Sequence, residues 1–505
     1  MSDSPVVIVG GGPVGMTFAL LLARHGVPSV ILEAAEQRDL VGSKALCMQR
    51  DVLDVLERVG CGDRLLREGV TWTLGRTYYR DHELFQITFP ELGENHYPPF
   101  VNIGQDRTEY WLENAVQENP LVDLRYGHVV TDVSTGDGVQ ALAETYSGEV
   151  EIAGSHVVGA DGARSVVRKI MGVGFEGRSF DDRFLICDIR ANLDFANERR
   201  FYFDPDWNPD RQVLIHPQRD SVWRIDWQVP STFDLEAEES SGGLDSRIRK
   251  IVGDRDYEIV WKSVYRFHQR LASSFRVERM FLVGDAAHLM SVFGARGLNS
   301  GIQDAENLAW KLGFVRRGWA DEALLDSYDA ERRAAAEENL RVTGATMDFL
   351  VPPTEELWSR RRTTLERAVG HPDAREMVDS GQLATPFDYA DSPLTTPGDG
   401  FIQPGQLVPD GPVVVGDRPE VHRLRQLFGT GFVVLTTEAW AGRAPSSRAV
   451  DTYSLSDIDR KGTLRQTIRL GPGRALVIRP DGHVAANVLA DADSVATALA
   501  KALAS

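Results

Sequence analysis

The N-terminal part of the chain alternates short apolar runs with longer stretches in which apolar positions recur at helical spacing. Residues 6–9 are all β-branched, as expected for a buried parallel strand, and a cluster of glycines follows them. Beyond the glycines, Gly15, Ala19 and Ala23 stand four residues apart. One face of the predicted helix therefore carries almost no side-chain atoms and can pack closely against a strand. Residues 28–32 form a second apolar run. This order predicts a strand-helix-strand unit.

Two further apolar runs predict strands of the same sheet far along the chain. Residues 152–160 and 280–283 each end at a polar segment that contains glycine. Helices are expected at about residues 52–59, 108–118, 302–315 and, as a charged stretch, 322–369. The chain is therefore expected to leave its first domain and return to it.

The pattern between these runs is different. Residues 183–229 contain several short strands at close spacing with little helix, and residues 71–89 alternate and are rich in aromatics. This predicts an antiparallel sheet, inserted between parts of the first domain, that could wall an aromatic pocket. Proline and glycine accumulate between residues 383 and 412, which indicates a domain boundary. The apolar runs 431–435 and 474–478 and an alanine-rich helix predict a small α/β unit beyond it.

Composition narrows the classes of function. A chain of 505 residues should divide into two to four domains, and its net charge of −19 makes nucleic acid an improbable partner because phosphate backbones are repelled. The uncharged stretch 4–23 follows only Asp3, lacks the cationic start of a signal peptide, and predicts no membrane partner. The scattered Cys47, Cys61 and Cys187 fit a cytoplasmic protein without disulfides.

The N-terminal glycines have the spacing of a dinucleotide-binding turn. Gly10, Gly12 and Gly15 match G-x-G-x-x-G directly after the first strand. The first allows a sharp turn, the second lets amides approach a pyrophosphate, and the third lets the helix pack on the strand. Glu33 lies 33 − 15 = 18 residues further on, where an acidic residue accepts from an adenosine ribose hydroxyl.

Two more polar segments follow predicted strands. Asp161 stands at a strand exit, where ligands bind in open α/β sheets, although it could instead cap the next helix. Asp285 follows the run 280–283, and a glycine-rich loop then leads into a helix near Asn299. The unpaired amides at the start of that helix suit a developing anion.

Taken together, these motifs resemble those of the single-component FAD-dependent aromatic hydroxylases, which share the para-hydroxybenzoate hydroxylase fold. Residues 10–15 with Glu33 resemble the ADP-binding fingerprint of that family, residues 158–165 with Arg168 its Asp-Gly motif, and residues 284–288 its Gly-Asp motif. Residues 474–485 are similar to the C-terminal thioredoxin-like domain of the branch with phenol and 3-(3-hydroxyphenyl)propionate hydroxylases; they include Arg479-Pro480-Asp481-Gly482-His483.

The resemblance implies an α/β fold with a FAD-binding Rossmann-like domain, an inserted antiparallel-sheet substrate domain and a C-terminal thioredoxin-like domain. The expected boundaries are residues 1–73, 106–180 and 277–345 for the FAD-binding domain, 74–105 and 181–276 for the substrate domain, 346–394 for a helical connector, and 395–505 for the C-terminal domain. That last domain has no Cys-x-x-Cys, which excludes thiol redox chemistry there.

The cofactors implied are noncovalent FAD and, as reductant, NADPH or NADH. By resemblance, Asp285 binds the ribityl chain, Gln105 and Lys44 face the flavin, and Asp161 helps to shape the site for both cofactors. The helix that begins near Asn299 is expected to point its positive end at the N1–C2 carbonyl edge of the flavin. The expected cofactor-binding residues are Gly10, Gly12, Pro13, Val14, Gly15, Glu33, Lys44, Gln105, Asp161, Asp285, Gly297, Leu298 and Asn299; no metal site is expected.

The loops over the flavin depart from the family pattern. Lys44 stands where arginine is usual, Ser291 and Val292 replace prolines, and Ala295-Arg296 replaces Gly-Gln. Arg296 is therefore a catalytic candidate, either as a cation near flavin or substrate or, in the plainer interpretation, as a surface arginine.

Three further catalytic candidates lie in the inserted sheet: His216, Arg224 and Trp227. Strand alternation can place only some of them on the inner face, and packing positions are the alternative for each. His288 is expected to be a structural part of the Gly-Asp motif.

The activity implied is monooxygenation: NAD(P)H reduces FAD, dioxygen adds to form a flavin C4a-hydroperoxide, and one oxygen atom passes to a phenolic or related aromatic. The partners implied are a small aromatic substrate, dioxygen and a second copy in a homodimer. The alternative activity is that of a flavin-dependent oxidase, dehydrogenase or tailoring enzyme that does not insert oxygen. A third possibility is a protein that carries the cofactor but serves as an interaction partner rather than an enzyme. A flavin-dependent halogenase does not fit, because Trp223 and Trp227 are too far apart for Trp-x-Trp-x-Ile-Pro.

Overall fold

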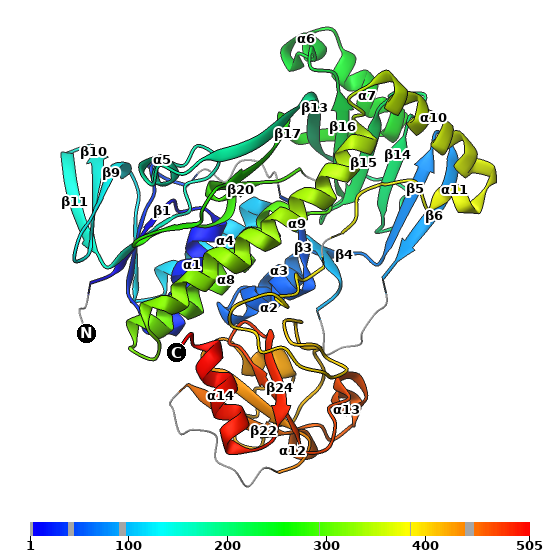
Figure 1. The fold of residues 1–505 in the computed structure, drawn as a ribbon. Helices are drawn as coiled ribbons and strands as arrows, with labels where there is room; N and C mark the ends of the chain where they lie inside the picture. Colours follow the sequence, from blue (N-terminus) through cyan, green and yellow to red (C-terminus); the bar gives the residue numbers. More distant parts are fainter. Residues whose placement is uncertain (1–3, 39–44, 90–96, 292, 384, 440–448) are drawn as a thin grey trace.

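The first sheet joins strands from four separate parts of the chain (Figure 1). In the computed structural model, which describes residues 4–38, 45–89, 97–291, 293–383, 385–439 and 449–505, this sheet has the order β18-β19-β12-β1-β2-β8. Its strands are β1 Val6–Val9, β2 Ser29–Leu32, β8 Val122–Arg125, β12 His156–Gly159, β18 Arg276–Val277 and β19 Met280–Leu282. All neighbours pair in parallel except β18 with β19.

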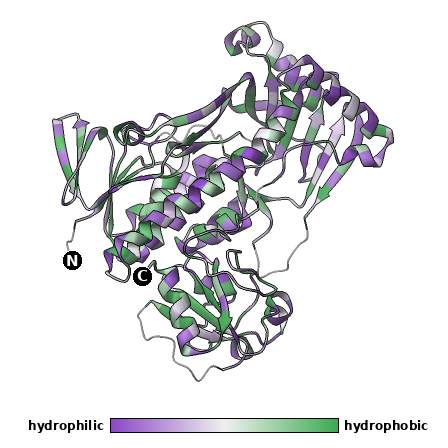
Figure 2. Ribbon diagram, in the orientation of Figure 1, coloured by the Kyte–Doolittle hydropathy of each residue, from purple (hydrophilic) through white to green (hydrophobic). Residues whose placement is uncertain are grey.

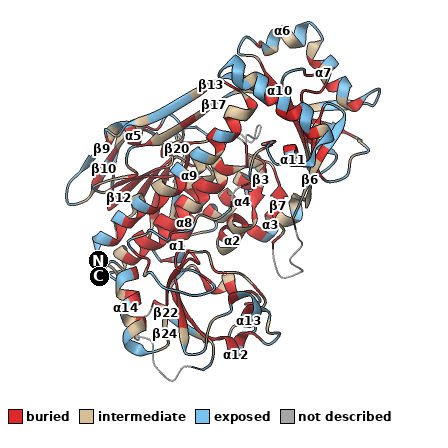
Figure 3. Cartoon of the chain, turned by 45° about the vertical axis from the view of Figure 1, so that its right-hand side comes forward, coloured by how far each residue is buried: buried red, intermediate tan, exposed pale blue. Residues whose placement is uncertain are grey.

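Helices cover this sheet, and the bare face predicted for the first of them is buried. Residues 15–22 of α1 (Pro13–Arg24) are buried between the sheet, α4 (Gln105–Gln117) and α8 (Arg296–Arg316). Figure 3 shows the buried positions concentrated in α1 and α8. The shorter elements nearby are α2 Arg50–Arg58, α3 Gly62–Glu68 and α5 Val166–Ile170, and a small sheet of β3 Cys47–Gln49, β7 Phe100–Asn102 and β4 Val70–Thr71.

The apolar run 152–160 forms two strands of different sheets, where the sequence pattern predicts one. Strand β11 (Gly148–Gly154) belongs to an antiparallel sheet with β10 (Val139–Thr145) and β9 (Val129–Thr135), whereas β12 lies in the first sheet. The chain changes sheets at Gly154, where a Cβ would come within 2.8 Å of the carbonyl oxygen of Pro5. Ser155 then donates its amide to the same oxygen at 2.8 Å.

The inserted segment forms an eight-stranded sheet, which confirms the expected fold class. Its order is β20-β17-β13-β16-β15-β14-β5-β6, and its pairs are antiparallel except β5 with β14. The strands are β5 Leu74–Tyr79, β6 His82–Thr88, β13 Phe175–Ala191, β14 Arg199–Phe203, β15 Gln212–Pro217, β16 Val222–Val229, β17 Tyr257–Ala272 and β20 His288–Leu289, and two helices, α6 Leu235–Ser240 and α7 Gly243–Val252, interrupt them.

The six-stranded sheet and the helices that cover it are called the first body below. Strands β13 and β17 form a long ribbon that connects the first body to the eight-stranded sheet (Figure 1). Near its start, Gly177 has φ +150, and a Cβ there would lie 1.9 Å from the carbonyl oxygen of Gln269. The register is irregular between Ser179 and Arg183. The ribbon is exposed along residues 176–178, whereas β13 is buried from Phe184 to Cys187.

The two ends of the predicted segment 74–105 lie in different sheets. Strands β5 and β6 belong to the eight-stranded sheet, but β7 pairs with β3 and β4 beside the first sheet. Residues 100–102 therefore lie with the first body, because their partners are strands that flank α2 and α3.

Strand β16 separates polar from apolar side chains on its two faces. Arg224 and Asp226 lie on the face toward a cavity described below. Trp227 lies on the opposite face, fully buried in a core with Leu244 and Ile248 of α7. The sequence-based candidacy of Trp227 for the site is therefore wrong, because successive residues of a strand point to opposite faces.

The charged helical stretch 322–369 is interrupted at Val351-Pro352-Pro353. It divides into η2 (Glu322–Leu325), α9 (Asp326–Leu350) and α10 (Glu355–Gly370), followed by α11 (Pro372–Arg375). Prolines lack the amide that a continuous helix needs, which accounts for the break. Helix α9 runs beside α8 and reaches from the first body to the eight-stranded sheet (Figure 1).

The C-terminal unit has a four-stranded sheet in the order β22-β21-β23-β24. Its elements are η3 Leu424–Leu427, β21 Phe432–Thr436, β22 Val450–Ser454, α12 Leu455–Ile458, α13 Thr463–Ile468, β23 Arg474–Ile478, β24 Val484–Leu489 and α14 Ala492–Ala502. An apolar contact joins it to α8: Trp310 and Phe314 meet the ring of Phe432 at 6.0 and 5.9 Å between centroids.

Hydrophilic and hydrophobic residues alternate along the surface helices, as Figure 2 shows. In the described part of the chain, none of the helices combines the length and the apolar character that crossing a membrane requires.

Replacing Trp227 tests the assignment of the two faces of β16. Trp227→Ala leaves a cavity in the core under α7, so we expect a loss of about 3–5 kcal/mol of unfolding free energy in urea denaturation. Trp227→Phe keeps a ring in place and should lose less. An unchanged unfolding free energy in the alanine variant would contradict this packing.

Candidate functional site

A cavity of about 400 Å³ lies between the first body and the eight-stranded sheet. One wall is made by the turns after β1, β12 and β19, which contribute Gly12–Val14, Ala160 with Gly162, and Val283–Asp285. These turns follow the carboxyl ends of parallel strands, the edge at which open α/β sheets bind ligands. The opposite wall is the inner face of β13 to β16.

The glycine turn after β1 has the close contacts that its spacing predicts. Gly10 has φ +107, and a Cβ there would lie 2.4 Å from the carbonyl oxygen of Ala160. A Cβ on Gly15 would lie 2.2 Å from the oxygen of Gly10. In contrast, no atom of the described residues lies within 4 Å of a Cβ built on Gly12, so space is open next to this amide. Pro13 and Val14 line the cavity beside it.

Glu33 lies against this turn and holds it. Its Oε2 accepts from the Gly11 amide at 2.7 Å, and its Oε1 accepts from the Ala35 amide at 2.9 Å. Arg38, which the sequence reasoning missed, donates to the oxygen of Gly11 at 2.8 Å and pairs with Glu113 at 2.7 Å. Arg38 stands in a loop without periodic pattern, so no sequence signal marks it.

Asp161 caps the helix that follows it. Its Oδ2 accepts from the amides of Val166 and Val167 at 2.7 and 3.2 Å. Its Oδ1 is buried and has no hydrogen-bond partner in the described part of the chain. The side chain is absent from the lining of the cavity, which is formed here by its neighbours Ala160 and Gly162. The capping alternative thus describes the contacts of Asp161.

The Gly-Asp turn is fixed from below by a buried carboxylate. Asp304 of α8 accepts from the Gly284 amide at 3.0 Å, from His288 Nε2 at 2.7 Å and from Arg332 Nε at 2.7 Å. Burial opposes its ionisation, but the interactions with His288 and with the guanidinium of Arg332 hold the pKa of Asp304 below its usual value. Asp285 is exposed at the cavity wall. His288 thus has a structural partner.

The first turn of α8 faces the cavity. The helix begins at Arg296, three residues before the expected start near Asn299, because Ala295 adopts a left-handed φ of +55 before it. Gly297 and Leu298 line the cavity, and the first turn of α8 carries no acidic residue. The Asn299 side chain donates to the oxygen of Cys47 at 2.8 Å and accepts from the Gln49 amide at 3.1 Å. It ties this turn to β3.

Gln105 lines the cavity from the start of α4. It accepts from the Ala45 amide at 3.4 Å and donates to Glu109 at 2.8 Å. Lys44 and Val292, two of the loop positions singled out in the sequence, lie outside the described residues.

A polar row crosses the opposite wall. In register, Asp188 of β13 faces Arg224 of β16, and Arg224 faces His216 of β15. Arg224 donates to both oxygens of Asp188 at 2.8 Å, so its charge is paired. Burial together with the charges of Arg199 and Arg224 lowers the pKa of His216 well below its usual value, which keeps the imidazole neutral.

Asp226 lies next to this row and was missed as a candidate. Burial raises its pKa to about 7, although Arg224 and Arg199 act in the opposite sense. Its Oδ1 and Nδ1 of His216 are buried without a hydrogen-bond partner among the residues described. Both side chains line the cavity, so two unpaired polar atoms face the same space.

Two buried arginines also line the cavity. Arg296 donates to Asn339 and, at 3.1 Å, to the oxygen of Gln382, so it is a fixed wall residue rather than a surface arginine. Burial lowers its pKa. Arg199 donates to the oxygen of Ser380 at 2.8 Å, and burial lowers its pKa to about 10. Sequence reasoning missed Arg199, as well as the aromatic lining residues Trp72, Tyr265, Phe267 and Phe293.

The first wall fits FAD. The open space at Gly12, the exposed carboxylate of Asp285 and the first turn of α8 converge on one cavity, and Glu33 holds the glycine turn at Gly11. The first amides of a helix have no partner within the helix. Backbone amides and a helix start suit a pyrophosphate and a ring that gains negative charge. Within the described residues, no three His, Cys, Asp or Glu side chains are grouped to hold a metal ion.

Comparison with known proteins gives the same picture. Residues 3–343 match the family model described as "FAD binding domain". A 3-(3-hydroxy-phenyl)propionate/3-hydroxycinnamic acid hydroxylase of Mycolicibacterium smegmatis is 30% identical over 85% of this chain and 76% of its own length. A 6-methylpretetramide 4-monooxygenase of Streptomyces rimosus is 29% identical over 99% of this chain and 94% of its own.

A solved structure supports the fold. The flavin-dependent monooxygenase PieE, in complex with FAD and substrate, superposes with a TM-score of 0.81 and 22% identity over 99% of both chains.

The open space at Gly12 gives a test of the cofactor site. Gly12→Ala should cost the apoprotein no more than about 1 kcal/mol, the scale of a helix N-cap change, because the new Cβ meets nothing in the protein. The same Cβ would occupy the approach of a pyrophosphate, so we expect FAD affinity to fall about 10-fold or more in fluorescence titration.

Gly10→Ala is the matched control. Its Cβ would meet the Ala160 backbone at 2.4 Å, so both apoprotein stability and FAD affinity should fall. Unchanged FAD affinity in a folded Gly12→Ala variant would place the pyrophosphate elsewhere.

Proposed function

The chain belongs to the FAD-binding domain family and is a flavin-dependent aromatic monooxygenase, and from this premise we propose that its substrate is a phenol held in the cavity. The ring hydroxyl lies against Asp226 and His216, and the ring lies among the aromatic side chains of the wall. The observation that carries the proposal is the pair of buried, unpaired polar atoms, Asp226 Oδ1 and His216 Nδ1, in the cavity that the FAD cradle also lines.

Bound FAD, reduced by NADPH or NADH, supplies dioxygen activation and the transfer of one oxygen atom to the ring. The protein supplies position and field. The turn of Gly10, Gly12 and Gly15 with Glu33 would hold the ADP part, and Asp285 would hold the ribityl chain. The first turn of α8, with Gly297 and Leu298, would direct amides and the positive helix end at the ring edge that becomes negative on reduction.

On the substrate side, Asp226 acts as the base that takes the proton from the substrate hydroxyl. When ionised, its Oδ1 accepts the proton of the phenolic hydroxyl and thereby raises electron density in the ring, which favours attack by an electrophilic oxygen. Arg224 is already paired with Asp188 at 2.8 Å, and its charge lowers the pKa of Asp226 less than burial raises it. Arg199 adds a cation at this wall that stabilises the resulting anion.

The names of the relatives support a phenolic or polycyclic aromatic substrate. The M. smegmatis relative is named for a hydroxyphenylpropionate, and the S. rimosus relative for 6-methylpretetramide. The remaining partners that we propose are dioxygen and a second copy of the chain. The homodimer rests on the C-terminal resemblance alone, and a cytoplasmic location on the three scattered cysteines.

Labelled dioxygen tests the activity. We expect a panel of phenols, aryl acids and polyketide-like aromatics to include a compound that accelerates NAD(P)H consumption and gives a product carrying one ¹⁸O atom in mass spectrometry. Label found only in peroxide or water, with a dehydrogenated product, would instead indicate the oxidase or dehydrogenase chemistry.

The pH dependence of catalysis tests Asp226. Because its pKa is about 7, kcat/KM should rise as the pH passes through that value and the carboxylate becomes able to accept a proton. Asp226→Asn should abolish this rise and lower kcat/KM by about 100-fold at pH 8, the usual size of a positioned base. Among the described residues, the charged groups that act on Asp226 are Arg224, Asp188 and Arg199, and His216 lines the same cavity.

Stability gives an independent check of the same pKa. The folded-state pKa of Asp226 lies above the ordinary 3.8, so protonation favours the fold and stability falls as the pH rises between about 4 and 7. This fall in Tm should be smaller in Asp226→Asn. A variant with the parental pH profile in both measurements would exclude Asp226 as the base.

A further inference from the structure

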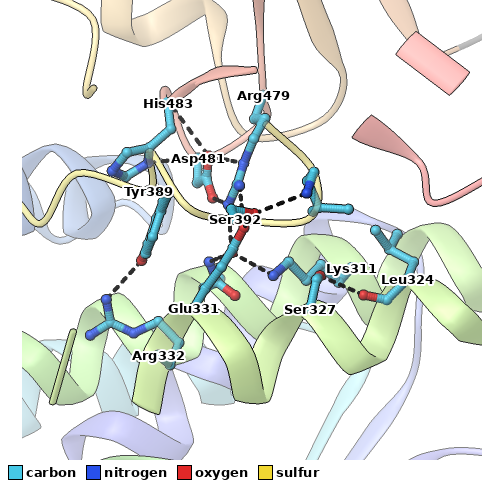
Figure 4. Close-up of polar contacts among 12 residues, drawn as sticks. Lys311, Leu324, Ser327, Glu331, Arg332, Tyr389, Ser392, Arg479, Asp481 and His483 are labelled. Carbon is cyan, nitrogen blue, oxygen red and sulfur yellow. Dashed lines mark hydrogen bonds and ion pairs between the residues drawn. The ribbon is translucent and has the colours of Figure 1, made fainter. Parts of the chain in front are cut away.

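The turn Arg479-Pro480-Asp481-Gly482-His483 of the C-terminal unit has no part in the function described so far. Arg479 is fully buried and holds two carboxylates (Figure 4). It donates to Glu331 of α9 through Nη1 at 2.5 Å and through Nη2 at 2.9 Å. It also donates to Asp481 at 3.1 and 2.5 Å. Asp481 in turn accepts from the indole nitrogen of Trp310 on α8 at 3.1 Å.

Glu331 receives donors from three parts of the chain. Besides Arg479, Lys311 of α8 donates at 2.6 Å, Asn307 of α8 at 2.7 Å and Ser392 of the connecting segment at 2.5 Å. Burial opposes its charge, yet Arg479 and Lys311 hold the pKa of Glu331 far below its usual value. The carboxylate is therefore fixed in one place between the C-terminal unit and α8.

The next residue of α9 carries the connection toward the cofactor site. Arg332 donates to Asp304 at 2.7 Å and to the oxygen of Ser300 at 3.2 Å. It also donates to the hydroxyl of Tyr389 at 2.8 Å, and the ring of Tyr389 lies 5.0 Å from the guanidinium of Arg479. Figure 4 shows Arg332 and Tyr389 beside the Glu331 cluster.

Asp304 is the carboxylate that holds the Gly284 amide and His288. Two clusters of buried charges, joined by the adjacent residues Glu331 and Arg332 of α9 and by Tyr389, thus lead from the C-terminal unit to the Gly-Asp turn and, at Ser300, to the first turns of α8. Each member has its partners within these clusters, so displacing one leaves another unpaired in the interior.

We propose that Arg479 and Asp481 are positioning residues for FAD: the C-terminal unit, through α9, keeps the Gly284–Asp285 turn in the arrangement that binds the cofactor. When Arg479 is lost, Glu331 and Asp481 repel each other, α9 shifts against α8, and Arg332 no longer fixes Asp304. FAD binding and docking of the C-terminal unit are therefore coupled. The inference depends on FAD binding by this family and not on the identity of the aromatic substrate.

A second ion cluster in the same interface provides a control. Arg423 of the C-terminal unit is also buried, and it pairs with Asp54 of α2 at 2.7 Å and with Asp410 at 2.6 Å. Among the residues that the structure describes, neither carboxylate bonds Gly284, His288 or Asp304. Breaking this cluster loosens the same interface without touching the set that reaches the Gly-Asp turn.

The test compares Arg479→Met with Arg423→Met in the full chain. Both should lower the Tm of the apoprotein, but Arg479→Met should raise the dissociation constant of FAD about 10-fold more, a usual size for coupling between sites. Hydrogen exchange of the apoprotein should be faster at the Gly284 amide in Arg479→Met only. Arg479→Lys, which keeps the charge without the two-pronged contact, should fall between parent and Arg479→Met.

Two further measurements, one on a double variant and one on a substitution of Asp481, test the same connection. The effects of Arg479→Met and Asp304→Asn on FAD affinity should be less than additive, because both act on one turn. If Arg479→Met does not fold, Asp481→Asn is measured instead; it keeps the size of the side chain but weakens the pair with Arg479, so FAD affinity should still fall more than in Arg423→Met. Equal FAD affinities in the Arg479 and Arg423 variants, or parental exchange at Gly284 in a folded variant, would overturn the proposal. All readouts are made without aromatic substrate, so absence of hydroxylation does not affect them.

Discussion

The geometry of the cofactor site depends on one buried carboxylate, that of Asp304. It accepts from the backbone of Gly284, from His288 of the same short segment, and from Arg332 of α9. An uncompensated charge in this position would be costly, since breaking a buried ion pair usually costs about 3–5 kcal/mol. Because Asp304 lies on α8, the helix that directs its first turn at the cavity also fixes the turn that carries Asp285. The two halves of the cofactor wall are therefore one unit.

The spacing of residues along the chain was sufficient to predict those parts of the site whose residues lie close together in the sequence. The glycine spacing of Gly10, Gly12 and Gly15 and the distance to Glu33 follow from the geometry of one strand-helix-strand unit, and the structure brings these residues together as predicted. The inserted antiparallel sheet was predicted from strand spacing alone. The helix start was misplaced by three residues because the left-handed backbone of Ala295, a residue that rarely adopts it, gives no signal in the sequence.

The substrate wall could not be predicted in the same way, because it depends on register between strands far apart in the chain. Asp188, Arg224 and His216 form a row only when β13, β16 and β15 pair as they do. The alternation of side chains along a strand predicts that Arg224 and Trp227 point to opposite faces, but it does not predict which of the two faces lines the cavity. Arg199, Asp226 and the aromatic lining were missed for that reason, and Arg38 because its loop has no pattern.

The two walls of the cavity belong to separate sheets, and the β13–β17 ribbon is one of the few continuous connections between them. A two-stranded ribbon twists more readily than a packed core deforms, and here its register is irregular and its first residues are exposed. The width of the gap between the FAD cradle and the polar row therefore depends in part on the twist of this ribbon. A change in ribbon twist would alter the width of the cavity with no side chain of either wall exchanged.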